Sequence, residues 1–170
     1  WYSYFYQCSE CRRCARSCPF GIDTCEVTFV ARQILHWLGI APKLHVTTGG
    51  AMEKVGNHMS LPKPGIIDTL EFLSEDILDE FGVEVNFPVD KPDSDILYIP
   101  SSADFSLNPY TLMGAGLFFT YIGANWTIPS GVTEAGNFGF LYDQQFTQRH
   151  NVMRLLDAAH ELGIKKIVWG

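Results

Sequence analysis

Apolar residues change their spacing near residue 95, which divides the chain into a helical first part and an alternating second part. Over residues 23–38 they recur at the 3.6-residue period of an amphipathic helix. Asp23 or Thr24 can cap that helix, and Gly39 follows its end. A second amphipathic helix is predicted over 66–81, and its acidic face is expected to be solvated. The apolar stripe of the first helix is expected to form part of the core.

From residue 95 the pattern becomes strand, helix, strand, helix and strand. This alternation is typical of a parallel sheet with crossover helices. In such sheets ligands bind at the loops that follow the carboxyl ends of the strands. Those loops are residues 101–107 and 130–141. The predicted strands cover 96–99, 125–128 and 164–169, and the predicted helices cover 109–122 and 143–162.

The composition excludes two classes of protein. With 46% apolar, 14% aromatic and 18% charged residues, the chain is not low-complexity disorder. A net charge of −7 leaves no Lys/Arg surplus to neutralise phosphates, so we expect no nucleic-acid partner. The most apolar stretch, residues 112–128, is broken by glycines and Asn125, and spanning a bilayer takes about 20 apolar residues. We therefore expect no membrane span and a cytoplasmic location, with membrane association only through a partner.

Both ends of the chain have unusual compositions for termini. Five aromatic residues occupy the first six positions, and no Met begins the chain. The last residues, 165–170, stop where a strand would finish. A free terminus is normally polar and mobile. We expect the sequence to be a fragment of a longer polypeptide.

The cysteines carry the most specific signal. Cys8, Cys11, Cys14 and Cys18 follow a Cys-x2-Cys-x2-Cys-x3-Cys spacing that ends in Pro19. Four thiols within eleven residues cannot form disulfides without strain. A zinc site would pair two short hooks across a longer gap, which this run lacks. The spacing matches the bacterial ferredoxin run, so these four cysteines are the predicted ligands of a [4Fe–4S] cluster.

The spacing leaves two questions open. In two-cluster ferredoxins the fourth cysteine binds the other cluster, so Cys18 either closes a single cluster or reaches a second one. Arg12, Arg13 and Arg16 lie inside the loop and either raise the reduction potential of the cluster or form a solvated positive face. Cys25 fits no ligand template and is predicted to be a buried residue of the following helix.

Other polar residues give weaker signals. His45 and His58 lie in a connector rich in Gly and Pro, and we expect surface or locally hydrogen-bonded side chains there. Glu134 has no partner carboxylate in the sequence, so it is predicted to be a surface or capping residue. His150 and His160 lie ten residues apart on one predicted helix and cannot share a metal ion.

The order of these elements resembles the iron–sulfur subunits of heterodisulfide reductase and its relatives. Residues 95–113 and 133–139 narrow the resemblance to the DsrK branch, which supplies the catalytic subunit of DsrMKJOP membrane complexes. The implied fold class is α/β, a ferredoxin-type [4Fe–4S] helical module followed by a parallel-sheet αβ domain. The implied domains are the second half of the ferredoxin-like module at 1–42, a helical connector at 43–94, and a first CCG-like domain lacking its cysteines at 95–170.

The resemblance also implies the cofactors. Cys8, Cys11 and Cys14 would hold one cubane, and Cys18 would reach a second whose other ligands lie upstream. Where relatives carry Cys-Cys-Gly, this chain has the run 134–136, Glu-Ala-Gly. A further non-cubane [4Fe–4S] cluster is therefore expected from a missing C-terminal domain, and no catalytic residue is assigned within this sequence.

The function that the resemblance implies is electron relay. Electrons would pass from the membrane haem/quinone subunit DsrM, with the other DsrMKJOP subunits, to a disulfide or trisulfide of the small protein DsrC. This is the chemistry of sulfate reduction, and sulfur oxidisers would run it in reverse. The alternative is an electron-transfer iron–sulfur subunit of a flavin dehydrogenase of the glycolate oxidase or glycerol-3-phosphate dehydrogenase type. A third possibility is a structural domain without redox function that keeps a vestigial cluster loop. The intact cysteine run argues against this possibility.

Overall fold

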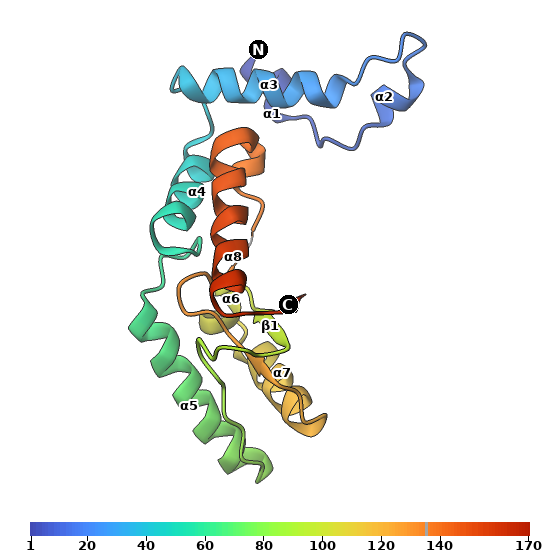
Figure 1. Ribbon diagram of the computed structural model, residues 1–170. Coiled ribbons are helices and arrows are strands. Elements are labelled where there is room, and N and C mark those ends of the chain that lie inside the picture. The colour runs from blue at the N-terminus through green and yellow to red at the C-terminus, as the bar shows by residue number, and fades with distance from the viewer. Residues whose placement is uncertain (135) are drawn as a thin grey trace. The chain divides into compact units, whose positions relative to one another are not determined.

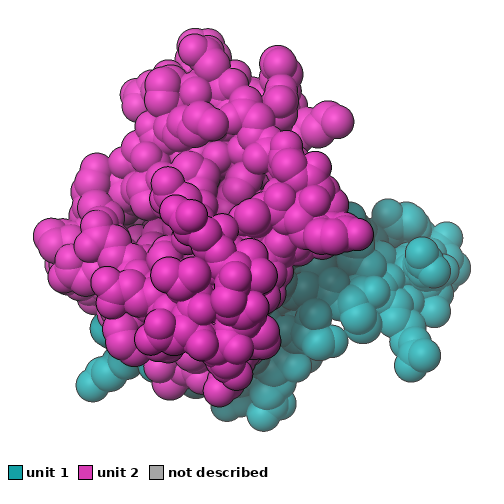
Figure 2. Space-filling view, turned by 90° about the horizontal axis from the view of Figure 1, so that it is seen from below, with its two compact units in different colours: residues 1–50, 137–150 teal, residues 51–136, 151–170 magenta. Residues whose placement is uncertain are grey.

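The computed structural model describes residues 1–134 and 136–170, which form two compact units (Figure 1, Figure 2). Unit 1 comprises Trp1–Gly50 and Asn137–His150. Unit 2 comprises Ala51–Gly136 and Asn151–Gly170. Each unit is therefore assembled from two segments that are distant in the sequence.

Unit 1 is helical and contains all the cysteines. The predicted helix after the cysteine run is confirmed as α3, and the Asp23 carboxylate caps it by accepting a 2.9 Å hydrogen bond from the Cys25 backbone N–H. The elements of this unit are α1 (Tyr2–Tyr6), α2 (Arg13–Ser17), α3 (Thr24–Trp37), the start of α4 (Lys43–Val55), the 3-10 helix η1 (Gly139–Leu141) and the short π-helix η2 (Gln144–Gln148).

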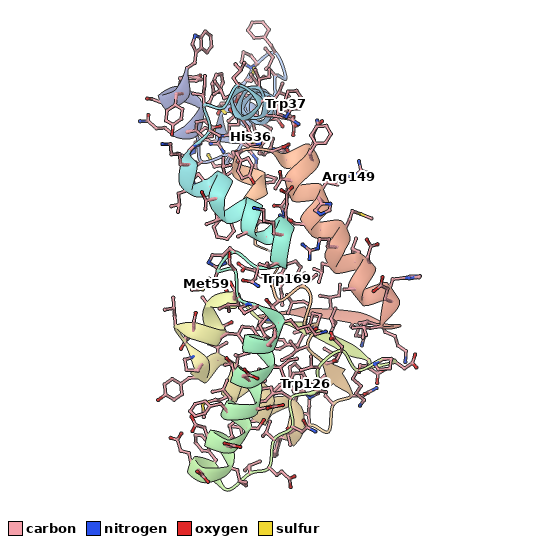
Figure 3. The ribbon with its side chains drawn as sticks, turned by 90° about the vertical axis from the view of Figure 1, so that its left-hand side faces the viewer. His36, Trp37, Met59, Trp126, Arg149 and Trp169 are labelled. Atoms are coloured by element: carbon pink, nitrogen blue, oxygen red, sulfur yellow. The ribbon has the colours of Figure 1, made fainter. Side chains whose placement is uncertain are left out.

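Aromatic rings connect α3 to the second segment of unit 1. The ring of Phe29 meets Phe140 edge-on at a centroid distance of 4.7 Å. Figure 3 shows His36 and Trp37 at the end of α3, and His36 lies 4.7 Å from the ring of Tyr142. Aromatic pairs of this kind contribute about 0.5–1.5 kcal/mol beyond their buried area.

The sequence prediction for α3 is right about the helix and wrong about its buried face. Val27, Val30 and Ile34 of the apolar stripe are about half exposed, at 53%, 50% and 48%. The buried face instead contains Arg32 and Gln33. These polar side chains can be buried because each is hydrogen-bonded, as with Gln33, whose amide donates to the Asp143 carboxylate at 3.2 Å.

The glycine-rich connector is also more helical than its composition suggests. Gly49 and Gly50 lie inside α4 and do not interrupt the helix. A Cβ atom on Gly49 would lie only 2.0 Å from the Tyr142 hydroxyl, so this glycine permits close packing and does not mark a turn. The next helix, α5 (Lys63–Phe81), begins slightly earlier than predicted and ends at Gly82, whose φ of 65° gives a left-handed cap.

Unit 2 contains the predicted parallel sheet. Its strand order is β2-β1-β3, and β1 pairs in parallel with both neighbours. The crossover helices α7 and α8 are confirmed, although the short π-helix η2 occupies the first residues of the predicted 143–162 helix. The short helix α6 was not predicted. The elements are β1 (Ile96–Ile99), α6 (Ser102–Ser106), α7 (Pro109–Tyr121), β2 (Trp126–Thr127), α8 (Arg149–Glu161) and β3 (Lys166–Trp169).

The helix α7 carries most of the apolar stretch that raised the question of a membrane span. It has 13 residues, and none of the helices described in the structure is long and apolar enough to cross a bilayer.

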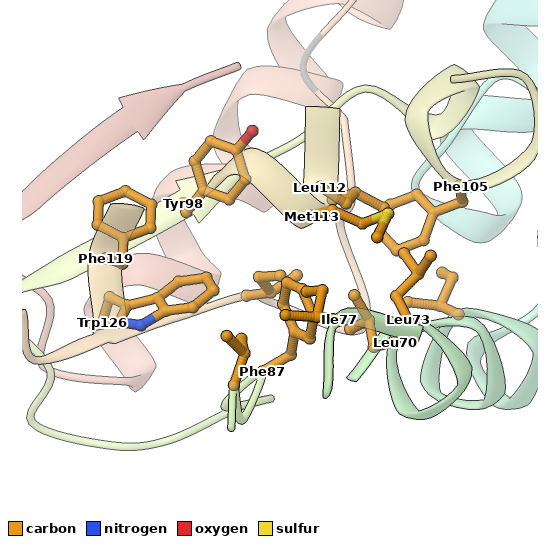
Figure 4. Close-up of a cluster of buried hydrophobic side chains, with 13 residues drawn as sticks. Leu70, Leu73, Ile77, Phe87, Tyr98, Phe105, Leu112, Met113, Phe119 and Trp126 are labelled. Atoms are coloured by element: carbon orange, nitrogen blue, oxygen red, sulfur yellow. The ribbon is translucent and has the colours of Figure 1, made fainter. Parts of the chain in front are cut away.

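Alternate residues of β1 face opposite sides of the sheet. Tyr98 packs in a larger cluster with α5 and α7, and Leu97 and Ile99 pack in a smaller cluster with α8. Figure 4 shows the larger cluster, in which Leu70, Leu73 and Ile77 of α5 meet Leu112 and Met113 of α7, and Phe119 stacks on Trp126 at 4.7 Å. Both faces of the sheet are therefore covered, as parallel sheets require.

The larger cluster predicts a strong contrast between two leucines of one helix. Leu73 is 2% exposed and Leu78 is 50% exposed. We expect Leu73→Ala to lower the free energy of unfolding by about 2–5 kcal/mol because it leaves a cavity. We expect Leu78→Ala to change it by about 1 kcal/mol or less. Urea denaturation measures both values, and equal losses would contradict the packing described here.

Candidate functional site

The four predicted ligands lie on one loop between α1 and α3. Cys8 follows α1, Cys14 lies within α2, and Cys18 caps the end of α2. Cys8 and Cys18 are partly buried, Cys11 and Cys14 are exposed, and all four thiols are free. The structure therefore brings the four predicted ligands onto one accessible segment of unit 1.

Two left-handed residues shape this loop. Glu10 has a φ of 58° and Arg12 a φ of 57°. Non-glycine residues adopt this region rarely and need surrounding contacts to hold them there. Arg12 has such contacts, because its guanidinium pairs with the Asp23 carboxylate at 3.4 Å and also bonds to Glu26. Part of the positive charge of the loop is thus matched by acidic residues at the start of α3.

Three of the four thiols have a hydrogen-bonding group beside them. The backbone N–H of Glu10 donates to Cys8 Sγ at 3.4 Å. Cys14 Sγ contacts the hydroxyl of Thr24. A hydrogen bond from the Arg13 backbone N–H lowers the pKa of the exposed Cys11 thiol. Donors of this kind favour the thiolate, which is the form that binds iron.

The donor set suits an iron–sulfur cluster. Each thiolate of a cubane binds a different iron atom, so its ligands need not converge on one point. Within residues 1–134 and 136–170, no three His, Cys, Asp or Glu side chains are arranged to hold a single metal ion. Four free thiols on one loop, with backbone N–H donors beside them, fit the ligand chemistry of a [4Fe–4S] cluster.

The fifth cysteine, Cys25, is buried, unlike the four predicted ligands. Its side chain is 2% exposed, as predicted, and its Sγ donates to the Glu10 carbonyl oxygen at 3.7 Å. Burial raises the pKa of this thiol. A buried thiol that is hydrogen-bonded within the fold is typical of a packing residue.

A second group of polar side chains gathers in unit 2, where strands β1 and β2 end. The Ser102 hydroxyl donates to Glu134 Oε2 at 2.6 Å, and His58 Nδ1 lies 2.6–2.7 Å from both oxygens of the same carboxylate. Ser102 is fully buried and Glu134 is 8% exposed. The prediction that Glu134 is a surface or capping residue is therefore wrong, and His58 is bonded to a residue 76 positions away instead of locally.

This group does not have the geometry of a nucleophilic triad. Ser102 Oγ and Glu134 both lie against the same ring nitrogen, Nδ1 of His58. A triad needs the nucleophile on one nitrogen and the carboxylate on the other. The group instead joins the connector to the carboxyl edge of the sheet. Ala135, in the run expected to replace Cys-Cys-Gly, lies outside the described residues.

The remaining candidate histidines lie on helices. His150 and His160 are exposed on α8, and His45 is partly buried in α4. The acidic face of α5 borders an open hollow of about 480 Å³ in unit 2, lined in part by Asp68, Asp76 and Tyr110. None of the four predicted cysteine ligands lines this hollow.

Comparison with known proteins gives two relatives. The chain is 33% identical, over its whole length, to the Hdr-like menaquinol oxidoreductase iron-sulfur subunit of Archaeoglobus profundus. Over 99% of its length it is 31% identical to the Hdr-like menaquinol oxidoreductase iron-sulfur subunit 2 of Archaeoglobus fulgidus. It is therefore similar to one part of these subunits. The chain spans 31% of the length of each. No protein-family profile and no solved structure matches it.

This similarity agrees with the resemblance found in the sequence at the level of the broader group of proteins. The resemblance to heterodisulfide-reductase-like iron–sulfur subunits is supported along the whole chain. Both names refer to a menaquinol oxidoreductase, and neither refers to sulfate reduction.

The buried carboxylate of Glu134 allows a direct stability test. Glu134→Ala removes the carboxylate that accepts from the Ser102 hydroxyl, and we expect it to lower the free energy of unfolding by about 1–3 kcal/mol. The matched control is Glu84→Ala, because Glu84 is exposed in the connector before β1. Its expected effect is within about 0.5 kcal/mol. Chemical denaturation of the two variants compares them, and a Glu134 loss no larger than the Glu84 loss would refute the bonded group.

Proposed function

We propose that this chain is an electron-transfer segment of an iron–sulfur subunit in an Hdr-like menaquinol oxidoreductase. One observation carries the proposal: four free thiols with ferredoxin spacing share a loop, in a chain that is similar over its whole length to two such subunits. The proposal places the redox chemistry of the chain in unit 1.

Cys8, Cys11 and Cys14 would hold one [4Fe–4S] cubane, and Cys18 would be a ligand of a second. A [4Fe–4S] cubane supplies one-electron transfer at a potential that hydrogen bonds to sulfur and nearby charge adjust. The chain contributes the thiolates, the Glu10 backbone N–H that donates to Cys8 Sγ, and the guanidinium groups of the loop. The exposure of Cys11 and Cys14 leaves this face of the loop accessible to an electron-transfer partner.

The proposed route begins at a membrane quinol. Oxidation of a menaquinol to menaquinone releases two electrons and two protons, and reduction of a disulfide to two thiols consumes the same number of each. We propose that a membrane haem/quinone subunit supplies the electrons and that the chain associates with the membrane through it, on the cytoplasmic side. Unit 2 has no cysteine, so thiolates for a catalytic cluster must come from elsewhere.

A finer proposal concerns the branch of the family. Residues 95–113 and 133–139 resemble DsrK, for which the electron acceptor would be a disulfide or trisulfide of DsrC and the membrane partner would be DsrM. The domain organisation proposed with it is a half ferredoxin module at 1–42, a connector at 43–94 and a cysteine-free CCG-like domain at 95–170.

A second candidate function uses the same cluster ligands. No cysteine follows Cys25, so this chain carries electron-transfer ligands but no recognisable thiolate set for sulfur chemistry. An iron–sulfur subunit of a flavin dehydrogenase needs only such ligands. In that case the electron donor would be a flavin and not a quinol, so the two candidates predict different donors.

Cysteine substitutions test the site. In the full-length protein purified anaerobically, we expect Cys8→Ala, Cys11→Ala and Cys14→Ala each to lose about four irons per chain, because one cubane is lost. The matched control is Cys25→Ala, since Cys25 is a cysteine of the same region with a buried thiol. This control should keep its full iron and acid-labile sulfide content.

Cys18→Ala separates the two ligation schemes. If Cys18 is a ligand of a second cubane, this variant alters an EPR signal that Cys8→Ala leaves intact. Equal iron in Cys8→Ala and the wild type, or a loss in Cys25→Ala as large as that in Cys8→Ala, would refute the proposed ligand set.

A further inference from the structure

Arg32 of α3 contacts the start of the cysteine loop and is almost fully buried, at 3% side-chain exposure. Its guanidinium donates to the Phe5 carbonyl oxygen through Nε at 3.0 Å and through Nη2 at 2.8 Å. Nη2 also donates to the Cys8 carbonyl oxygen at 2.5 Å. Nη1 forms an ion pair with the Glu10 carboxylate, and the guanidinium lies 5.4 Å from the ring centroid of Tyr6. One side chain thus contacts the residues on both sides of the first cysteine.

The contact with Glu10 has a direct consequence for Cys8. Glu10 is in the left-handed region, which a glutamate adopts only when other contacts hold it. In that conformation its backbone N–H points to Cys8 Sγ and donates a hydrogen bond at 3.4 Å. The ion pair with Arg32 holds the side chain of the same residue. The N–H donor and the partner of the guanidinium therefore belong to the same residue.

We propose that Arg32 is a positioning residue for the iron–sulfur site: it fixes the Cys8 carbonyl and Glu10 so that the Glu10 N–H bonds to Cys8 Sγ. The inference rests on the proposed function, because it concerns a ligand of the proposed cluster. Within the described residues the guanidinium hydrogen-bonds to the carbonyl oxygens of Phe5 and Cys8 and to the Glu10 carboxylate, so it acts on the loop and not directly on a thiol.

The chemistry of this position requires arginine. The planar guanidinium donates in three directions at once, to Phe5, Cys8 and Glu10, whereas an ammonium group is a compact point charge without that fixed fork. The N–H···S bond would favour the reduced, more negative state of a cluster bound at Cys8, and without Arg32 the Glu10 carboxylate two residues away would lose its neutralising partner. Loss of Arg32 is therefore expected to lower the reduction potential of that cluster.

The test uses the full-length protein, purified anaerobically with the subunits that accompany it. Arg32→Gln is compared with Arg16→Gln, which removes the same charge from an exposed position in the loop. We expect Arg32→Gln to shift the reduction potential of one cluster to a more negative value, by more than Arg16→Gln does, and to alter the EPR line shape of that cluster. Arg32→Lys keeps the charge without the fork and should restore the potential only partly.

A double variant separates positioning from folding. If Arg32→Gln fails to retain iron, the variant that combines it with Glu10→Gly should recover iron, since glycine adopts the left-handed conformation without help and leaves no unpaired carboxylate. Recovery supports the inference. Identical potentials and spectra in Arg32→Gln and Arg16→Gln overturn it, and so does an iron-free double variant. Absence of iron from the wild type is a different result, because it overturns the proposed function and the inference together.

Discussion

The burial of the Arg32 guanidinium is the constraint on which the geometry of the cysteine loop depends. An ion removed from water costs several kcal/mol unless its donors are satisfied, and here two carbonyl oxygens and one carboxylate satisfy them. Those acceptors belong to the end of α1 and to the first part of the loop. The loop is therefore held against α3 by hydrogen bonds and an ion pair. Burial raises the pKa of the Glu10 carboxyl group, although the charge of Arg32 acts in the opposite direction.

The amphipathic pattern predicted the helices well because their caps and stops are local features. Asp23 caps α3 and Gly82 ends α5 through contacts made within a few residues. The pattern could not predict which face of α3 is buried, because this depends on bonds to residues far along the chain, such as that between Gln33 and Asp143. One signal could have located Arg32: it lies seven residues after Cys25, on the same helix face as a cysteine predicted to be buried.

The predicted site divides in the same way. The cysteine ligands can be predicted from the sequence because the spacing of four cysteines within eleven residues is specific to the ferredoxin run. The bonded group of His58, Ser102 and Glu134 is not readable, since its members come from three distant segments that meet only when the parallel sheet forms. A buried carboxylate at the carboxyl edge of the sheet could therefore be found only in the folded chain.

The two units suggest a division of labour within the proposed subunit. Unit 1 provides thiolates and the donors that adjust them, and unit 2 provides a parallel sheet covered on both faces, with no cysteine of its own. This arrangement suits a relay that receives electrons and passes them on to a site built by other residues. The central claim is that these electrons come from a menaquinol.

The most direct measurement is EPR of the full-length, anaerobic protein with its accompanying subunits after addition of a reduced menaquinone analogue. Parallel samples receive glycolate, glycerol 3-phosphate or dithionite. The account predicts that the quinol produces a reduced-cubane signal, that this signal is absent from Cys8→Ala, and that the two flavin-enzyme substrates produce none. A cluster that dithionite or a flavin-enzyme substrate reduces, but that the quinol leaves oxidised, would contradict it.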